Sequence, residues 1–364
     1  MESSITRRTL LCAPLALSPL APRFRRGTRG IAWTDVAGWP VEGRAFSERA
    51  APFDRLPARA EGVVRKPVWD LSRHASGMSI RFETNAPELR VRCLLGDPSL
   101  AMPHMPATGK SGVDLYGWKD GRWRFIAVSK PARPDYEALL FAGAGREQRT
   151  FALYLPLYNS VRRLELGVPE GSILRPLPRR SSPLVFYGTS ILQGASAPRP
   201  GLAWPALVGR ALDRPIVNLG FSGNGRMEAA LAGLMGDIDA RAYVVDCPPN
   251  MAPGEVSERA EPFVRLLREK RPDAPILLIE DRTFANAWFA LGRARGHEER
   301  RRALRRAFES LQREGVSGLH LLGGADLLGD DDATADGSHP NALGMRRQAD
   351  RVAEELLRIL PDGR

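Results

Sequence analysis

The stretch Leu184-Val185-Phe186-Tyr187-Gly188-Thr189-Ser190 decides the fold of the second half of this chain. Its first four residues are apolar without interruption, which predicts a short strand that is covered on both faces. Four further runs of this kind follow at residues 216–219, 242–245, 276–279 and 319–322. We therefore expect five strands of one sheet.

Segments with helical periodicity separate these runs. They lie at about residues 204–212, 225–235, 255–270 and 297–314, and a last one covers about 343–359. Pro205 fits the first turn of the first helix, where no backbone N–H is needed. Alternation of strand and helix predicts a doubly wound α/β domain with a mainly parallel sheet.

The first half of the chain has a different pattern. Between residues 31 and 170, short runs alternate apolar and polar side chains, and Asp120-Gly121 supplies a hairpin turn between two of them. This pattern predicts an antiparallel β-sandwich. We expect a leader at residues 1–29, a β-sandwich domain at 30–170, a linker rich in Pro, Arg and Ser at 171–182, and the α/β domain at 183–364.

Composition excludes several classes of protein. The chain has 364 residues, 43% of them apolar, which suits two domains with sizeable cores. Its net charge is +11, but we find no dense basic stripe interleaved with aromatic residues, so we expect no nucleic-acid partner. The arginines at 300–302, 305 and 306 flank apolar residues at helical spacing, which predicts the solvated face of an amphipathic helix.

Cysteine and histidine spacing indicates neither a disulfide framework nor a metal site. Of the three cysteines, Cys12 lies in the leader and Cys93 and Cys247 lie in different predicted domains. We expect Cys247 to be a small buried residue, and we expect no metal and no cofactor. Four histidines without partners at ligand spacing are expected at the surface or in packing: His74, His104, His297 and His320.

The N-terminus has the pattern of an export signal. Arg7-Arg8 lies within a segment that resembles a twin-arginine motif, and an apolar stretch follows at residues 10–21. That stretch is too short to span a bilayer, and no other segment reaches 18 unbroken apolar residues. We favour export over a disordered basic tail, and we expect no transmembrane helix.

Polar residues follow the predicted strands at one edge of the sheet. Ser190 follows the first strand, Gly223 the second and Asn250 the third, while Asp336 and His339 come after the fifth. Ligands of open α/β sheets bind beyond these carboxyl ends. The sequence therefore predicts that the five residues lie around one site.

These residue types suit acyl transfer. Ser190 needs an adjacent base to act as a nucleophile, and His339 can take its proton and return it to the leaving group. Asp336 is close enough in sequence to hold the imidazole of His339 in the required tautomer. The backbone N–H groups of Ser190 and Gly223 and the side-chain amide of Asn250 are candidates for an oxyanion hole.

The order of these residues resembles that of the SGNH/GDSL hydrolases. Ser190, Gly223, Asn250 and His339 match the four residues that name the family, and Asp336 to His339 matches its Asp-x-x-His ending, over about residues 183–360. Residues 111–117 resemble the Gly-x-Asp-Leu-Tyr signature of a subgroup with an N-terminal β-domain. The resemblance implies a flavodoxin-like three-layer SGNH domain behind the sandwich. It also implies a serine ester hydrolase that acts on O-acetylated carbohydrates.

The sequence departs from the family pattern at two places. The usual Gly-Asp-Ser-Leu is here Gly188-Thr189-Ser190-Ile191, and the usual Gly-x-Asn-Asp is here Pro248-Pro249-Asn250-Met251. Neither departure removes a proposed chemical role, so they bear on the subfamily and the substrate rather than on the type of reaction.

Two alternatives to a carbohydrate deacetylase stay open. One is a lipid or thioester acylhydrolase, and the other is a carbohydrate-binding protein whose hydrolase domain is idle. Phe284, Trp288 and Phe289 follow the fourth strand and fit equally the wall of an acyl or sugar pocket and the packing of a core. The expected partner is a glycan or small-molecule ester.

Overall fold

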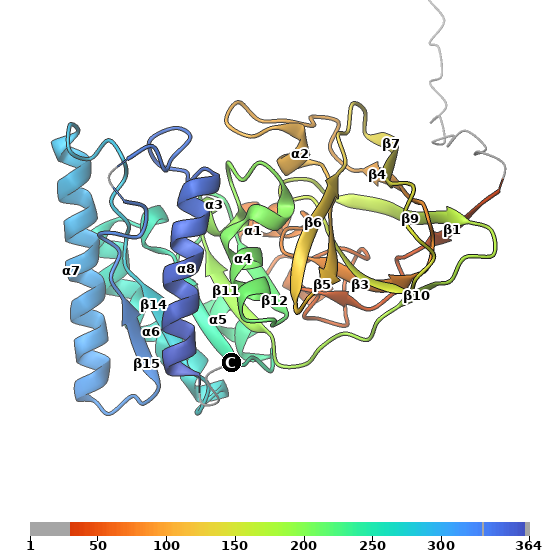
Figure 1. The fold of residues 1–364 in the computed structure, drawn as a ribbon. Coiled ribbons are helices and arrows are strands. Elements are labelled where there is room, and N and C mark those ends of the chain that lie inside the picture. Colours follow the sequence, from red (N-terminus) through yellow and green to blue (C-terminus); the bar gives the residue numbers. More distant parts are fainter. Residues whose placement is uncertain (1–29, 330, 361–364) are drawn as a thin grey trace, which may run out of the picture.

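The structure is a computed structural model that describes residues 30–329 and 331–360. These residues form two antiparallel sheets followed by a parallel sheet between helices (Figure 1). The leader at residues 1–29, with its Arg7-Arg8 motif, lies outside the described residues. Within the described ranges, no helix has both the length and the apolar character needed to cross a membrane.

Ten strands build the antiparallel part. They are β1 (Ile31–Asp35), β2 (Val41–Glu42), β3 (Ser79–Thr84), β4 (Leu89–Leu95), β5 (Asp114–Lys119), β6 (Arg122–Val128), β7 (Asp135–Phe141), β8 (Arg149–Tyr154), β9 (Val161–Pro169) and β10 (Leu174–Pro176). One sheet has the order β1-β9-β4-β7, and the other has the order β10-β3-β8-β5-β6 with β2 on β3. Val91 and Leu164 of the first sheet share a core with Ile80 and Leu153 of the second. This confirms the predicted antiparallel sandwich.

The predicted hairpin turn is present between β5 and β6. Lys119 pairs with Arg122, so the loop has only two residues, and Asp120 and Gly121 have φ values of 52° and 73°. A turn with positive φ at both positions matches the twist of the flanking strands, which is why Asp-Gly forms it readily.

Five parallel strands form the second sheet. They are β11 (Leu184–Gly188), β12 (Ile216–Gly220), β13 (Ala242–Asp246), β14 (Ile276–Ile279) and β15 (Leu319–Leu322), in the order β12-β11-β13-β14-β15. The longer helices around them are α4 (Trp204–Ala211), α5 (Ala229–Gly236), α6 (Pro253–Lys270), α7 (Leu291–Arg313) and α8 (Ala342–Ile359). The predicted doubly wound α/β domain is confirmed.

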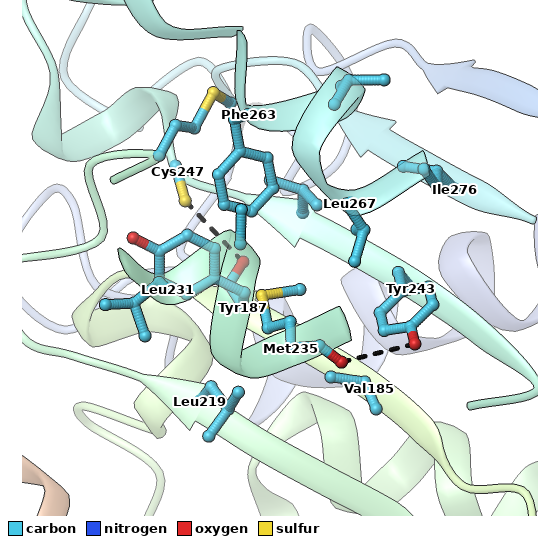
Figure 2. Close-up of a cluster of buried hydrophobic side chains, with 14 of the residues drawn as sticks. Val185, Tyr187, Leu219, Leu231, Met235, Tyr243, Cys247, Phe263, Leu267 and Ile276 are labelled. Atoms are coloured by element: carbon cyan, nitrogen blue, oxygen red, sulfur yellow. Dashed lines mark hydrogen bonds between the residues drawn. The ribbon is translucent and has the colours of Figure 1, made fainter. Parts of the chain in front are cut away.

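The continuous apolar runs are explained by burial on both faces of this sheet. Val185 and Tyr187 of β11 share one core with α5, α6 and α7, whereas Leu184 and Phe186 share the other with α4 and α8. Figure 2 shows the first of these cores, in which Tyr187 stacks on Phe263 at a centroid distance of 5.5 Å. Cys247 is buried in the same core, as expected.

Three short helices interrupt the β-rich half and were not predicted: η1 (Ala58–Ala60), α1 (Lys66–Ser72) and α2 (Ala107–Lys110). Phe46, Leu56 and Val68 of this half pack in the core of the α/β domain rather than in the sandwich. The segment 171–182 also differs from a plain linker, because β10 pairs with β3. Pro176 is tolerated in β10 because this strand lies at the edge of its sheet.

The arginines of α7 are not all solvated, so that part of the prediction is wrong. Arg300 donates to the Asp281 carboxylate over 2.5 Å, and Arg301 donates to the Asp281 backbone carbonyl over 2.7 Å. Arg305 pairs with buried Glu280. Glu280 and Asp281 directly follow β14, and buried carboxylates need such partners.

A buried arginine joins the two halves of the molecule. The guanidinium of Arg55 is fully buried and donates to the carbonyl oxygens of Asn218 and Gly220 in β12, over 3.1 and 2.6 Å. It also donates to the carbonyl oxygens of Leu71 and His74. Burial lowers the pKa of Arg55 to about 9. These bonds fix residues 71–74 to the end of β12.

A second buried charge pair lies under the carboxyl edge of the parallel sheet. Asp246, the last residue of β13, accepts a hydrogen bond of 2.5 Å from Arg282, which follows β14. Both side chains have zero exposure. Gln348 of α8 lies 3.5 Å from the other carboxylate oxygen, so the pair links two strands and a helix.

Arg282→Leu should lower the free energy of unfolding by about 3–5 kcal/mol, because it leaves the buried Asp246 carboxylate without its charge partner. Urea unfolding measures this change. The double variant Asp246→Leu/Arg282→Leu should lose less than the single variant. Arg302→Leu is the control, since Arg302 is 62% exposed in its ion pair with Glu298. Equal losses for Arg282→Leu and Arg302→Leu would contradict the account.

Candidate active site

The candidate nucleophile, Ser190, is the first residue of a single helical turn, α3 (Ser190–Gln193), directly beyond β11. Thr189 caps this turn, and its hydroxyl accepts a hydrogen bond from the backbone of Ile191. Gly194, with φ of 108°, ends it. Ser190 is only 7% exposed. A short helix between a strand and a glycine therefore holds the hydroxyl at the carboxyl edge of the sheet.

His339 and Asp336 lie beside Ser190. The Ser190 Oγ is 2.9 Å from His339 Nε2, and His339 Nδ1 is 2.7 Å from Asp336 Oδ2. Asp336 and His339 belong to one tight turn, in which Gly337 has φ of 87°. Asn341 caps α8 immediately afterwards by accepting from the backbone of Leu343 and Gly344. The structure thus brings the three predicted catalytic residues into one hydrogen-bonded series.

The Asp336 carboxylate is stabilised in its charged form. Partial burial by itself would raise the pKa of Asp336, but hydrogen bonds outweigh this effect and hold the pKa well below its usual range. The donors are the backbone N–H of His339, the His339 ring and the backbone N–H of Ser338. Asp336 is therefore a carboxylate throughout the neutral range and favours a proton on His339 Nδ1.

The candidate oxyanion-hole residues lie around the same strand ends. Gly188 of β11 is in register with Gly220 of β12 and Asp246 of β13. A Cβ on Gly225 would come 2.4 Å from the Gly188 carbonyl, so only glycine allows this loop to approach β11 so closely. The Asn250 side-chain oxygen accepts from the backbone N–H of Gly225 over 3.3 Å.

Gly223 follows β12 and Asn250 follows β13, and these two strands flank β11, which leads to the candidate nucleophile. Gly223 is exposed and has φ of 70°. With its oxygen engaged by Gly225, the Asn250 amide keeps its nitrogen available for another acceptor. The backbone N–H groups and this amide are the donor types that an oxyanion requires.

The N-terminal half contacts the nucleophile turn directly. The Tyr158 hydroxyl donates to the Ser190 carbonyl over 3.2 Å, and the Ser76 hydroxyl donates to the Gln193 carbonyl over 2.7 Å. The Gln193 side chain lies 3.2 Å from His74 Nδ1. Burial lowers the pKa of His74 to about 4, so its ring is neutral and accepts from the Gln193 amide. Residues of both halves therefore hold α3.

The Gly-x-Asp-Leu-Tyr motif is a joint between the two halves. Asp114 has zero exposure and accepts from Arg199 over 2.7 Å and from the backbone of Gly201 over 2.9 Å. The Tyr116 hydroxyl also accepts from Arg199. Arg199 directly precedes η2 (Pro200–Leu202), Gly201 belongs to it, and η2 leads into α4. The motif therefore fixes the sandwich against the α/β domain.

The three candidate wall residues do not share one environment. Phe284 is half-buried and makes an edge contact with His297, with ring centroids 4.5 Å apart. Trp288 and Phe289 are 80% and 78% exposed. Phe284 and Trp288 line a hollow of about 470 Å³, and Phe289 is not among its lining residues. Asn286 between them packs against Gly337, which places this loop beside the turn that carries His339.

Sequence reasoning missed several residues around the site. His104, expected at the surface or in packing, stacks on His339, and its position shortly before the Gly112–Tyr116 motif is the only local hint. Arg282 carries no motif that would reveal its buried pairing with Asp246. In the part of the chain that the structure describes, no three metal-ligating side chains of His, Cys, Asp or Glu form a cluster.

The geometry agrees with what comparisons with known proteins find. The model of the GDSL-like lipase/acylhydrolase family matches residues 181–357, and that of the N-terminal region of SGNH-hydrolase-type esterases matches residues 31–174. No curated protein matches the chain.

Solved structures share this fold over most of the chain. One described as a GDSL-like lipase from Bacteroides ovatus is 33% identical, with a TM-score of 0.87, and the alignment covers 91% of this chain and 98% of that one. A salicylyl-acyltransferase from a tetracycline biosynthetic pathway is 21% identical, with a TM-score of 0.75 and coverages of 92% and 99%. A family two carbohydrate esterase from Clostridium thermocellum, in complex with cellohexaose, is 12% identical, with a TM-score of 0.51 and coverages of 78% and 94%.

The second and third likenesses show a common fold alone. The first combines substantial identity with almost complete coverage of both chains, and it agrees with the matched family models. This chain therefore belongs to the GDSL-like lipase/acylhydrolase family of SGNH-type esterases and is an ester hydrolase.

Proposed function

We propose that Ser190, His339 and Asp336 form the catalytic triad of this ester hydrolase, and that its substrates are O-acetyl esters of carbohydrates. The observation that carries the triad is the pair of short contacts from Ser190 Oγ to His339 Nε2, 2.9 Å, and from His339 Nδ1 to Asp336, 2.7 Å. These lie within the hydrogen-bond range that nucleophile activation requires.

The reaction proceeds in two steps. His339 removes the proton from Ser190 as the hydroxyl attacks the ester carbonyl, and it then protonates the departing alcohol. In the second step His339 removes a proton from water, which attacks the acyl-enzyme, and His339 returns that proton to Ser190 Oγ as the acid leaves. Asp336 stabilises the imidazolium in both steps. The Ser190 and Gly223 N–H groups and the Asn250 amide bind the oxyanion.

A carbohydrate substrate is supported by the architecture and by an exposed aromatic surface. The same two-part fold occurs in a family two carbohydrate esterase that was solved with cellohexaose. Trp288 is exposed on the loop whose Asn286 packs against Gly337 of the His339 turn, and Trp288 and Phe284 both line a hollow there. We also infer export, from the Arg7-Arg8 leader.

A lipid acylhydrolase is the second candidate, because Trp288, Phe289 and Leu291 are three exposed apolar side chains in one short segment. Large exposed apolar residues at one place are typical of sites that meet lipid or another apolar partner.

Ser190→Ala should abolish hydrolysis of a short-chain nitrophenyl ester and leave the melting temperature unchanged, because it removes only the attacking oxygen. An organophosphonate ester should label the wild-type protein at Ser190. The matched control is Ser310→Ala, which alters a serine of α7 outside the proposed site and should keep full activity. A labelled serine elsewhere, or an active Ser190→Ala protein, would refute the assignment.

Asp336→Asn should reduce kcat by about 10²–10⁴ because it favours the wrong tautomer of His339. The pKa of Asp336 is held low, so its charge stays constant above about pH 4. On the acid side of the pH profile, wild-type kcat/KM should then decline with the uptake of a single proton, by the general base. His339→Ala and the double Asp336→Ala/His339→Ala should lose similar activity. Additive losses, or a profile with no acid decline, would contradict a single proton-transfer unit.

Acyl-chain profiling tests the substrate class. We expect kcat/KM to be highest for nitrophenyl acetate and to fall steadily through butyrate to octanoate, and we expect acetate release from acetylated xylan. Trp288→Ala should raise KM for the polymer but not for nitrophenyl acetate, while Trp118→Ala, which alters a 40%-exposed tryptophan of the sandwich, should change neither. A preference for octanoate would support the lipid candidate instead.

A further inference from the structure

A second histidine faces the candidate general base. The rings of His104 and His339 lie nearly parallel, with an interplanar angle of 17° and a centroid distance of 5.2 Å. His104 belongs to the N-terminal half and His339 to the turn before α8. The contact thus brings a ring from the sandwich domain against the member of the triad that must move protons.

The turn that carries His104 is built to hold its position. Met102 and Met105 exchange both of their backbone hydrogen bonds, at 2.8 and 3.0 Å, so Pro103 and His104 form the two-residue tip of a tight turn. Met105 is buried, and it packs in the core that lies against β11. A turn closed in this way and anchored by a buried side chain presents its tip in a defined place.

Both ends of the segment are also fixed. Lys110 is buried, and its ammonium donates to the Asp97 carboxylate over 2.9 Å and to the Ser99 carbonyl over 2.5 Å. The Thr108 hydroxyl donates to the carbonyl of Pro198 in the α/β domain over 2.6 Å. A Cβ on Gly109 would come 2.2 Å from the Ala197 carbonyl, so the two domains meet backbone to backbone here. Residues 97–110 are therefore tied to the stretch directly after α3.

The contacts that the His339 ring receives from its own turn are polar and lie at Nδ1, from Asp336 over 2.7 Å and from Ser338 Oγ over 3.4 Å, whereas the ring packed against its face comes from His104. His339 stands on a turn with a left-handed glycine, and its side chain is 23% exposed. Its two nitrogens are aligned by Ser190 and Asp336, but only when the ring keeps one orientation about its Cβ–Cγ bond. A planar group packed against its face restricts that rotation.

We propose that His104 is a positioning residue, which acts by packing its ring on His339 so that the imidazole stays aligned between Ser190 and Asp336. The inference rests on the proposed triad. It assigns the sandwich domain a direct part in catalysis, through the flat ring at the tip of its 102–105 turn. The chemistry of the His104 nitrogens is not required, so another flat ring should replace it.

The test compares His104→Ala with His104→Phe in the full chain, with nitrophenyl acetate as substrate and with kcat and KM measured separately. His104→Ala should lower kcat by about tenfold with KM unchanged, a smaller loss than removal of a triad member. His104→Phe should stay within about twofold of the wild type. The rate of inactivation by an organophosphonate should fall for His104→Ala by the same factor as kcat/KM.

Controls separate the possible failures. His104 is at a half-exposed tip, so both variants should melt with the wild type, and His320→Ala, in β15, should keep full activity. Wild-type kcat in His104→Ala, a loss in His104→Phe equal to that in His104→Ala, or a change in KM alone would each overturn the proposal. Ser190→Ala is assayed in parallel: if it is inactive while His104→Ala is unaffected, only the role of His104 fails, whereas an active Ser190→Ala protein removes the triad itself.

Discussion

The placement of one helical turn, α3, is the constraint on which the site depends. Its first residue is Ser190, and the loop of Gly225 closely approaches the Gly188 carbonyl at the end of β11, just before this turn. The sandwich domain fixes it from the side, because Tyr158 and Ser76 donate to its carbonyl oxygens. A candidate nucleophile held by two domains has little freedom to leave the line between the candidate base and the oxyanion-hole candidates, and such preorganisation is how a site lowers a barrier.

The two domains consequently form one functional unit. Arg55 binds the end of β12, and Asp114 of the Gly-x-Asp-Leu-Tyr motif binds Arg199 before α4. Arg55 and Asp114 are both buried and hydrogen-bonded across the two halves, so separating the domains would expose charged groups that have lost their partners. The sandwich is thus part of the wall around the site rather than an appended module. This also explains how a ring from residue 104 reaches the triad turn.

Much of the fold and the core of the site could be predicted because their signals are local. The run 184–187 is apolar without interruption since both faces of β11 are covered, and the residues after each parallel strand must gather at one edge. The partners of Arg300, Arg301 and Arg282 could not be predicted, because their carboxylates lie on other elements and a charge at helical spacing gives no sign of what it faces. His104 escaped for the same reason: a stacked ring on a two-residue turn leaves no periodic pattern.

The central claim is that the ester's acyl group passes through a covalent bond to Ser190. The most direct measurement is mass spectrometry of the protein quenched in acid during turnover of nitrophenyl acetate, followed by peptide mapping. A fraction of the wild-type protein should gain one acetyl group, on the peptide that contains Ser190. An acetyl group on another residue, or turnover by wild type with none trapped on Ser190 while His339→Ala stays equally active, would contradict it.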